Sequence, residues 1–94
     1  MALPLYDSIT AQANVTVSTA AALPTVSCRA VVLQSDPANT ANIYLGSSAS
    51  VTSAGVLAWG VLRPGEWRVI PTNSTSDIFA VAASSSKLLV GTAL

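Results

Sequence analysis

The residues that could carry out chemistry are few in this 94-residue chain, and they lie far apart. There is no histidine, and the carboxylates stand at only four positions: Asp7, Asp36, Glu66 and Asp77. Metal sites and hydrolytic carboxylate pairs need such groups in clusters, and no spacing here predicts a cluster. We therefore expect no catalytic residue, no metal site and no cofactor, and the sequence does not indicate an enzyme.

Cys28 is the only cysteine, so it has no partner for a disulfide within the chain. A catalytic thiol needs a neighbouring base, usually histidine, and the chain has none. The segment VSCRAVVL around it has the composition of a strand. We expect Cys28 to act as a small buried hydrophobic residue.

Three aromatic residues could form a binding surface. Tyr44, Trp59 and Trp67 are suited either to stacking on a sugar or to filling a small core or a subunit interface. Trp67 begins a stretch of alternating polarity, which predicts Trp67 and Val69 facing the core, opposite Arg68. Trp59 lies in VLAWGVL, which is apolar all round and fits either a core or an interface.

Charged residues make up only 9% of the chain, and the formal net charge is zero. Without a basic field, nucleic acid is not an expected partner. So few charges suit a surface that is rich in Ser, Thr and Asn, or one that other subunits cover, and we expect both. Arg29 and Arg68 are lone charges in apolar strands. Each either faces solvent and blunts a sheet edge or forms a salt bridge between subunits.

The elements that would position these residues are short strands. Runs rich in Val, Ile and Thr, separated by turn residues, predict strands near 14–19, 25–35, 42–45, 56–62, 67–71, 78–83 and 87–92, with 49–51 as a candidate edge strand. Asp36-Pro37 indicates one turn, and Arg63-Pro64-Gly65-Glu66 fits a type II turn. The predicted fold class is all-β: a small antiparallel β-sandwich, jelly-roll-like or Ig-like, with seven to eight short strands.

The stretch 30–33, AVVL, is apolar on both faces of its predicted strand. Such a pattern is typical of a strand that is covered on both sides. The cover on the second side is either another element of the chain or another subunit. No stretch predicts a membrane span, because the longest apolar run, 78–83, has six residues and a spanning helix needs about 18 or more.

We expect two parts, an N-terminal arm over residues 1–12 and a single β-sandwich domain over 13–94. The arm contains Leu3, Leu5 and Tyr6, with Pro4 opposing regular structure. Apolar side chains of this kind would be unfavourable in water. We expect the arm to lie against its own sandwich or a neighbouring subunit, with the neighbour favoured.

Three runs of this sequence, VVLQSDPANTANIYLG, LRPGEWRVIP and SDIFAVAA, together resemble a recurring pattern in small virion proteins of tailed bacteriophages. The resemblance covers residues 29–83. It implies a structural protein that decorates or cements the head shell, or forms part of head or tail fibres.

On that basis we expect a capsid decoration protein that binds the major capsid protein on the virion head surface after synthesis in the host cytoplasm. It would act as a homo-oligomer, with a trimer favoured, and without membrane or nucleic acid partners. A head-fibre, tail-associated or glycan-binding module is the alternative. The predicted interface residues are Leu3, Pro4, Leu5, Tyr6, Arg29, Tyr44, Trp59 and Arg68.

Overall fold

The computed structural model describes residues 9–94, and these residues form nine β-strands and one short 3-10 helix. The elements are β1 (Ile9–Ala11), β2 (Val15–Val17), β3 (Ala21–Ala22), β4 (Ala30–Ser35), β5 (Ile43–Gly46), β6 (Ala58–Leu62), β7 (Trp67–Pro71), η1 (Thr75–Asp77), β8 (Phe79–Ala82) and β9 (Ser86–Ala93). The all-β prediction is confirmed. Over this part of the chain, no helix is both long and apolar enough to cross a membrane.

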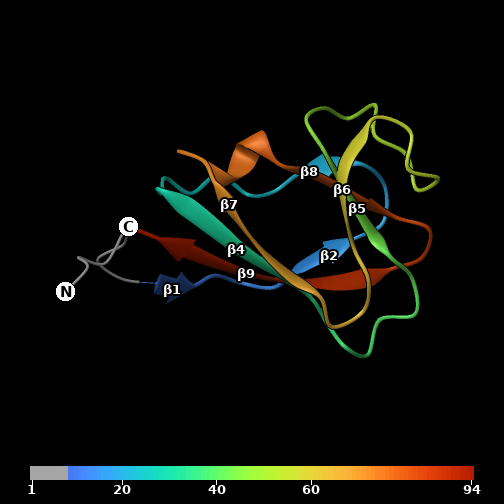
Figure 1. Ribbon diagram of the computed structural model, residues 1–94, viewed down its shortest axis with the longest axis horizontal. Coiled ribbons are helices and arrows are strands. Elements are labelled where there is room, and N and C mark those ends of the chain that lie inside the picture. The colour runs from blue at the N-terminus through green and yellow to red at the C-terminus, as the bar shows by residue number, and fades with distance from the viewer. Residues whose placement is uncertain (1–8) are drawn as a thin grey trace.

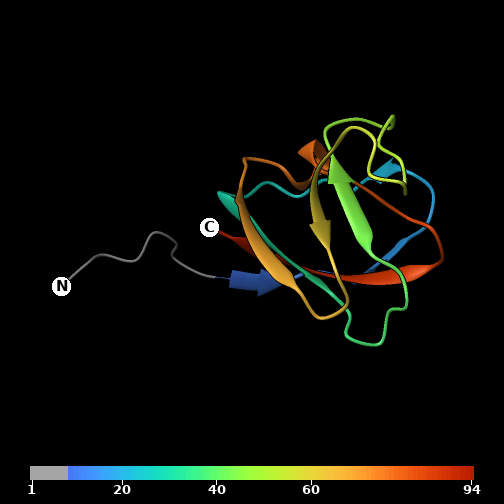
Figure 2. The same cartoon turned by 45° about the vertical axis from the view of Figure 1, so that its right-hand side comes forward.

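The strands form two antiparallel sheets that face each other (Figures 1 and 2). Sheet A has the order β1-β9-β4-β7, and β2 pairs with the first half of β9. Sheet B has the order β3-β8-β5-β6. The arm predicted over residues 1–12 overlaps β1, whose residue Ile9 pairs with Ala93 in sheet A. Leu3, Pro4, Leu5 and Tyr6 lie outside the described residues.

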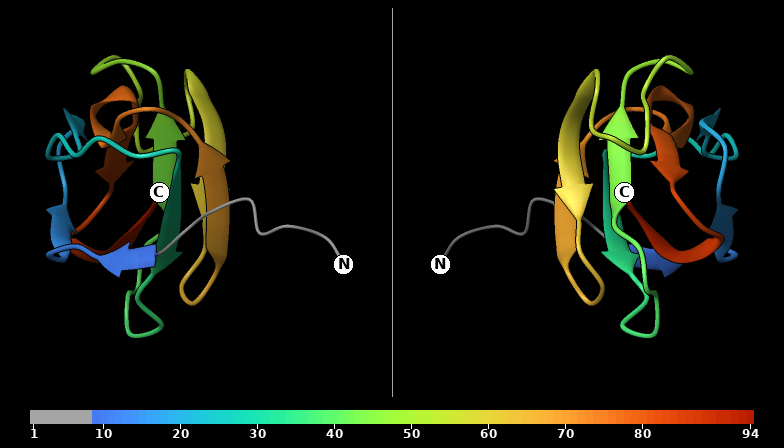
Figure 3. Two further views of the ribbon diagram at one scale, coloured as in Figure 1. Left: turned by 90° about the vertical axis from the view of Figure 1, so that its left-hand side faces the viewer. Right: turned by 90° about the vertical axis from the view of Figure 1, so that its right-hand side faces the viewer.

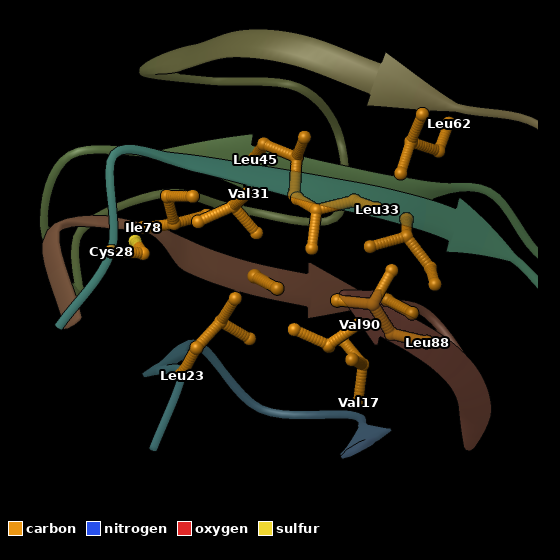
Figure 4. Packing of buried hydrophobic residues seen from close by; sticks show 13 residues of the cluster. Val17, Leu23, Cys28, Val31, Leu33, Leu45, Leu62, Ile78, Leu88 and Val90 are labelled. Atoms are coloured by element: carbon orange, nitrogen blue, oxygen red, sulfur yellow. The ribbon is translucent and has the colours of Figure 1, made fainter. Parts of the chain in front are cut away.

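The core lies between the two sheets and is built mainly from alternate residues of β4, β5, β8 and β9 (Figure 4). In β4, Val31 and Leu33 are fully buried, and in β5 the same is true of Ile43 and Leu45. Tyr44, between them, points to the other side of sheet B and is only partly buried. The predicted directions of residues 43–45 are therefore confirmed.

The predicted type II turn connects the two sheets, because β6 belongs to sheet B and β7 to sheet A. Gly65 has φ +87°, a value that favours glycine. The Glu66 carboxylate accepts a hydrogen bond from the Arg63 amide at 2.7 Å and forms an ion pair with the Arg63 guanidinium at 3.7 Å. This crossing puts the edge strands β6 and β7 next to each other on one flank (Figure 3).

The turn after β4 is held by a side chain that continues the sheet. The Asn39 side-chain oxygen accepts from the Lys87 amide at 2.9 Å, and its nitrogen donates to the Lys87 carbonyl at 2.8 Å. It also donates to the Ser35 hydroxyl at 2.9 Å. Asp36 caps the turn by accepting from the Ala38 amide at 2.8 Å. Asn39 therefore pairs with β9 as a strand residue would.

The candidate edge strand at 49–51 is wrong. Residues 47–57 form a loop between β5 and β6 instead. Val51 is 3% exposed and lies against Gly46, where an added Cβ would be 2.6 Å from the Val51 Cβ. Its apolar character therefore reflects anchoring of a loop rather than strand pairing.

We expect Asn39→Ala to lower the free energy of unfolding by about 1–3 kcal/mol, because it removes three hydrogen bonds and leaves the Lys87 amide without its partner. Urea denaturation followed by tryptophan fluorescence measures this change. Thr40→Ala, at the exposed next position, is the matched control and should be nearly neutral. Equal effects of the two substitutions would contradict the role assigned to Asn39.

Candidate assembly surface

The groups that could do chemistry are not brought together by the fold. Among residues 9–94, no three His, Cys, Asp or Glu side chains lie close enough to hold a metal ion. Cys28 is buried, and its thiol donates to the Thr72 carbonyl at 3.3 Å. Burial raises the pKa of this thiol, and the Asp77 carboxylate raises it further. The thiol is therefore protonated and poorly nucleophilic at neutral pH.

The predicted orientation of β7 is wrong. Trp67 is 65% exposed and Val69 is 40% exposed, so both point outward rather than into the core. Arg68 points inward instead, since it pairs in register with the buried Leu33. It fits because β7 is an edge strand facing Gly60 of β6, where an added Cβ would lie 2.5 Å from an Arg68 guanidinium nitrogen.

The outer face of sheet A, the side turned away from sheet B, is largely apolar along β1, β9, β4 and β7, whereas β2 and the start of β9 place Thr16 and Lys87 on it. In register order it carries Ile9 and Ala11 from β1, Leu89 and Gly91 from β9, Val32 and Gln34 from β4, and Trp67 and Val69 from β7. Ile9 is 66% exposed, comparable to Trp67. No helix or strand of the described residues lies across this face. Of the two outward-facing residues of the AVVL strand, Ala30 at its start is buried, whereas Val32 is only partly buried.

Part of this face is hollowed. A depression of about 450 Å³ lies over β1, β4 and β9, with Ile9, Val32, Leu89 and Gly91 among its lining residues. Gly91 contributes no side chain, and Val32 and Ala11, its partners across the sheet, are small. The pairing with β9 is also interrupted between β1 and β2, and there Gln12 and Asn14 form a polar rim of the depression. We call this depression the sheet A hollow.

The outer face of sheet B brings Tyr44 and Trp59 together. Both line a second, shallower hollow with Gly55 and Val61. Gly55 has φ +87°, and a Cβ placed there would lie 3.4 Å from the Tyr44 ring. Trp67 is on the opposite sheet, so a platform of Tyr44 and Trp67 is not formed.

The charged side chains lie at the ends of the sandwich rather than on its faces. One end carries the Arg63–Glu66 pair and an ion pair between Lys87 and Asp36 at 3.9 Å. At the other end Asp77 accepts from the Thr72 hydroxyl at 2.8 Å, and Thr72 donates its amide to the Arg29 carbonyl. Arg68, between the sheets, is the exception. Among the residues that the structure describes, none places a charge along the middle of either outer face.

The predicted interface residues therefore fall in separate places. Tyr44 and Trp59 share one hollow, Arg29 is exposed at the end of β4, and Arg68 is partly buried between the sheets. Neither arginine forms an ion pair with a carboxylate of residues 9–94. The exposed apolar residues Trp67, Val69 and Ile9 were not among the predicted interface residues. The AVVL pattern was the sequence signal for the face that carries them.

Comparisons of the chain with protein-family models, with curated proteins and with solved structures give no match. Function is therefore argued from the surface of the chain itself, together with the resemblance of its motifs.

We expect the contribution of Cys28 to stability to decline at alkaline pH. The pKa of the thiol is raised in the folded state, whereas in the unfolded chain it ionises at its ordinary pKa of 9.0. Above pH 9.0 the unfolded state releases a proton that the folded state keeps, so folding becomes less favourable.

The measurement is urea denaturation of the native chain and of Cys28→Ala from neutral pH to above pH 9.0. The difference in unfolding free energy between the two proteins should shrink as the pH rises. A difference that stays constant over this range would show that the thiol is not held protonated by burial.

Proposed function

We propose that this chain is a structural virion protein of a tailed bacteriophage, a decoration or cement protein that binds the outer head shell as an oligomer. The observation that carries the proposal is the uncovered apolar outer face of sheet A, with charges placed at the ends of the sandwich. The resemblance of the sequence motifs to small virion proteins of tailed bacteriophages is the reason for proposing a phage head as the assembly. The proposed partners are the major capsid protein and further copies of this chain, with a trimer favoured.

Burial of this face would supply the binding free energy. Trp67 and Ile9 are each about two-thirds exposed, and complete burial of a large apolar side chain contributes about 1.5–3 kcal/mol. Interfaces commonly depend on a few such anchors, tryptophan above all. A cementing role also needs no catalytic group, which agrees with a protonated, buried Cys28 thiol.

A glycan-binding or fibre-associated module is the second candidate, because Tyr44 and Trp59 line one hollow. Aromatic side chains at such a place suit stacking on a sugar ring. The other lining residues are Gly55, Ala58, Gly60 and Val61, so the Tyr44 hydroxyl and the Trp59 indole N–H are the only polar side-chain groups there. Sugar hydroxyls need several hydrogen-bonding partners, and this hollow therefore favours an apolar contact.

We expect the chain to co-sediment with phage particles and to appear on the outer head shell in electron cryo-microscopy. Trp67→Ser should weaken binding of the purified protein to head shells prepared without this protein by about 30-fold. That corresponds to a loss of about 2 kcal/mol in binding free energy, which is typical of an interface hot spot. Trp59→Ser, on the other sheet, is the matched control. Location in the tail, or absence from particles, would show the cement role to be wrong.

The glycan alternative is tested with Trp67→Phe, which leaves Trp59 as the only tryptophan. We expect no saturable change in its fluorescence across a broad panel of bacterial surface glycans, since the hollow offers so few polar groups. A saturable change that Tyr44→Ala abolishes would support the glycan-binding function instead.

A further inference from the structure

The loop between β5 and β6 presents two large apolar side chains to solvent. Val56 is 58% exposed and Leu57 is 67% exposed. Leu57 also has φ 60°, a left-handed conformation that a leucine adopts only at a cost in energy. Nothing in the fold requires a leucine there, because its side chain adds nothing to the core. We call these two residues the loop tip.

The loop tip is held rigidly. Thr52 donates its amide to the Val56 carbonyl at 3.0 Å, and its hydroxyl accepts from the Val56 amide at 3.1 Å. The Gly55 amide donates to the Thr52 carbonyl at 3.0 Å. Buried Val51 anchors the base of the loop against Gly46. The backbone that carries the two apolar side chains is therefore held before any contact, which reduces the entropy lost on binding.

The sheet A hollow is chemically suited to receive such a tip. Ile9, Ala11, Val32 and Leu89 supply apolar walls, and no charged residue is among its lining. A closed apolar cavity of roughly 150 Å³ already holds a benzene-sized group. The hollow, at about 450 Å³, is open and larger, so it has room for both tip side chains.

We propose that the loop tip of one copy of this chain inserts into the sheet A hollow of a second copy. The tip belongs to the β5–β6 connection of sheet B (Figure 1), whereas the lining residues place the hollow on the outer face of sheet A. The loop tip of a copy therefore does not lie in the hollow of the same copy. The inference deepens the proposed function and rests on it only for the view that copies associate.

A second copy fits better than other occupants for two reasons. Both contact surfaces are uncharged, and the chain has zero net charge, so copies do not repel each other at long range. The tip and the hollow are also present in the same molecule, so every copy carries both surfaces of the proposed contact.

This contact is head-to-tail, because it joins two different surfaces. Head-to-tail contacts close into rings when the rotation between copies permits it, and otherwise extend into filaments. The favoured trimer is one ring of this kind. A two-fold dimer through the faces of sheet A would instead bring identical surfaces together.

Two substitutions distinguish the head-to-tail contact from the two-fold dimer, and both are compatible with the fold. Leu57→Gly removes the tip at a backbone angle that glycine prefers, so its melting temperature should equal or exceed that of the native chain. Gly91→Leu fills the hollow, and its Cβ would lie at ordinary contact distance, 3.6 Å from Ile9 and 3.7 Å from Val32. Ser53→Gly, in the same loop, and Gly91→Ala are the matched controls.

The experiment is sedimentation velocity over a range of concentrations of the full chain. We expect the native chain and both controls to self-associate. Leu57→Gly and Gly91→Leu should each raise the dissociation constant by about 30-fold or more. An equal mixture of these two variants should form a complex of only two chains, because one intact tip still meets one intact hollow.

Three results would overturn the inference: a native chain that is monomeric at high concentration, Leu57→Gly that associates normally, or Gly91→Leu that associates more strongly. The last result would indicate a two-fold contact that gains apolar surface. Loss of association in Leu3→Ser/Leu5→Ser, with Leu57→Gly unaffected, would assign the hollow to residues 1–8 instead. A monomer that still binds shells would refute this contact but not the cement role. An oligomer that is absent from phage particles would refute the cement role but not this contact.

Discussion

A two-layer sandwich buries apolar side chains only between its sheets, and several large apolar residues of this chain do not lie there. Apolar residues make up 51% of the sequence, while the core is a single layer between sheet A and sheet B. Apolar residues outside this layer are left on the surface. Trp67, Val69 and Ile9 are therefore exposed because the fold has no third layer, and the same constraint shapes the rest of the surface.

The few charges are placed where they do not interrupt these faces. Asp36 and Lys87 meet at the end of β4, and Arg63 and Glu66 lie in the turn between the sheets. Exposed pairs of this kind contribute only about 0–1 kcal/mol to stability. Their position therefore matters more for solubility and for the direction of association than for holding the fold. Charged ends leave the outer faces as the surfaces on which another molecule would bind.

The fold class followed from the sequence because strand patterns and turn chemistry are local. The Arg63–Glu66 turn and the directions of Ile43 and Leu45 depend on neighbouring residues alone. The direction of β7 does not depend on neighbouring residues alone. Alternation shows that Trp67 and Arg68 face opposite ways, but it does not show which of the two faces the core. Arg68 takes the inner side because an edge strand beside Gly60 leaves space for a guanidinium, and that is a property of the tertiary structure.

The candidate surface was only partly predictable for the same reason. The AVVL run showed that β4 needs cover on a second face, but not which neighbouring strands would share that face. The sheet A hollow arises from Gly91 and from the break between β1 and β2, and both become visible only once β1, β9 and β4 are in register. Leu57 likewise looks like any loop leucine until its φ angle is known.

The two ends of the outer face of sheet A can serve different contacts. The hollow lies over β1, β9 and β4, whereas Trp67 and Val69 are on β7 at the other edge. Strands in a sheet are about 4.8 Å apart, so β7 is next to β4, at the near side of the hollow, and roughly 10 Å from β9, the strand that carries Gly91. A loop tip in the hollow would therefore leave the Trp67 edge free for the shell. Self-association and shell binding would then be additive, and each copy would strengthen the attachment of its neighbours.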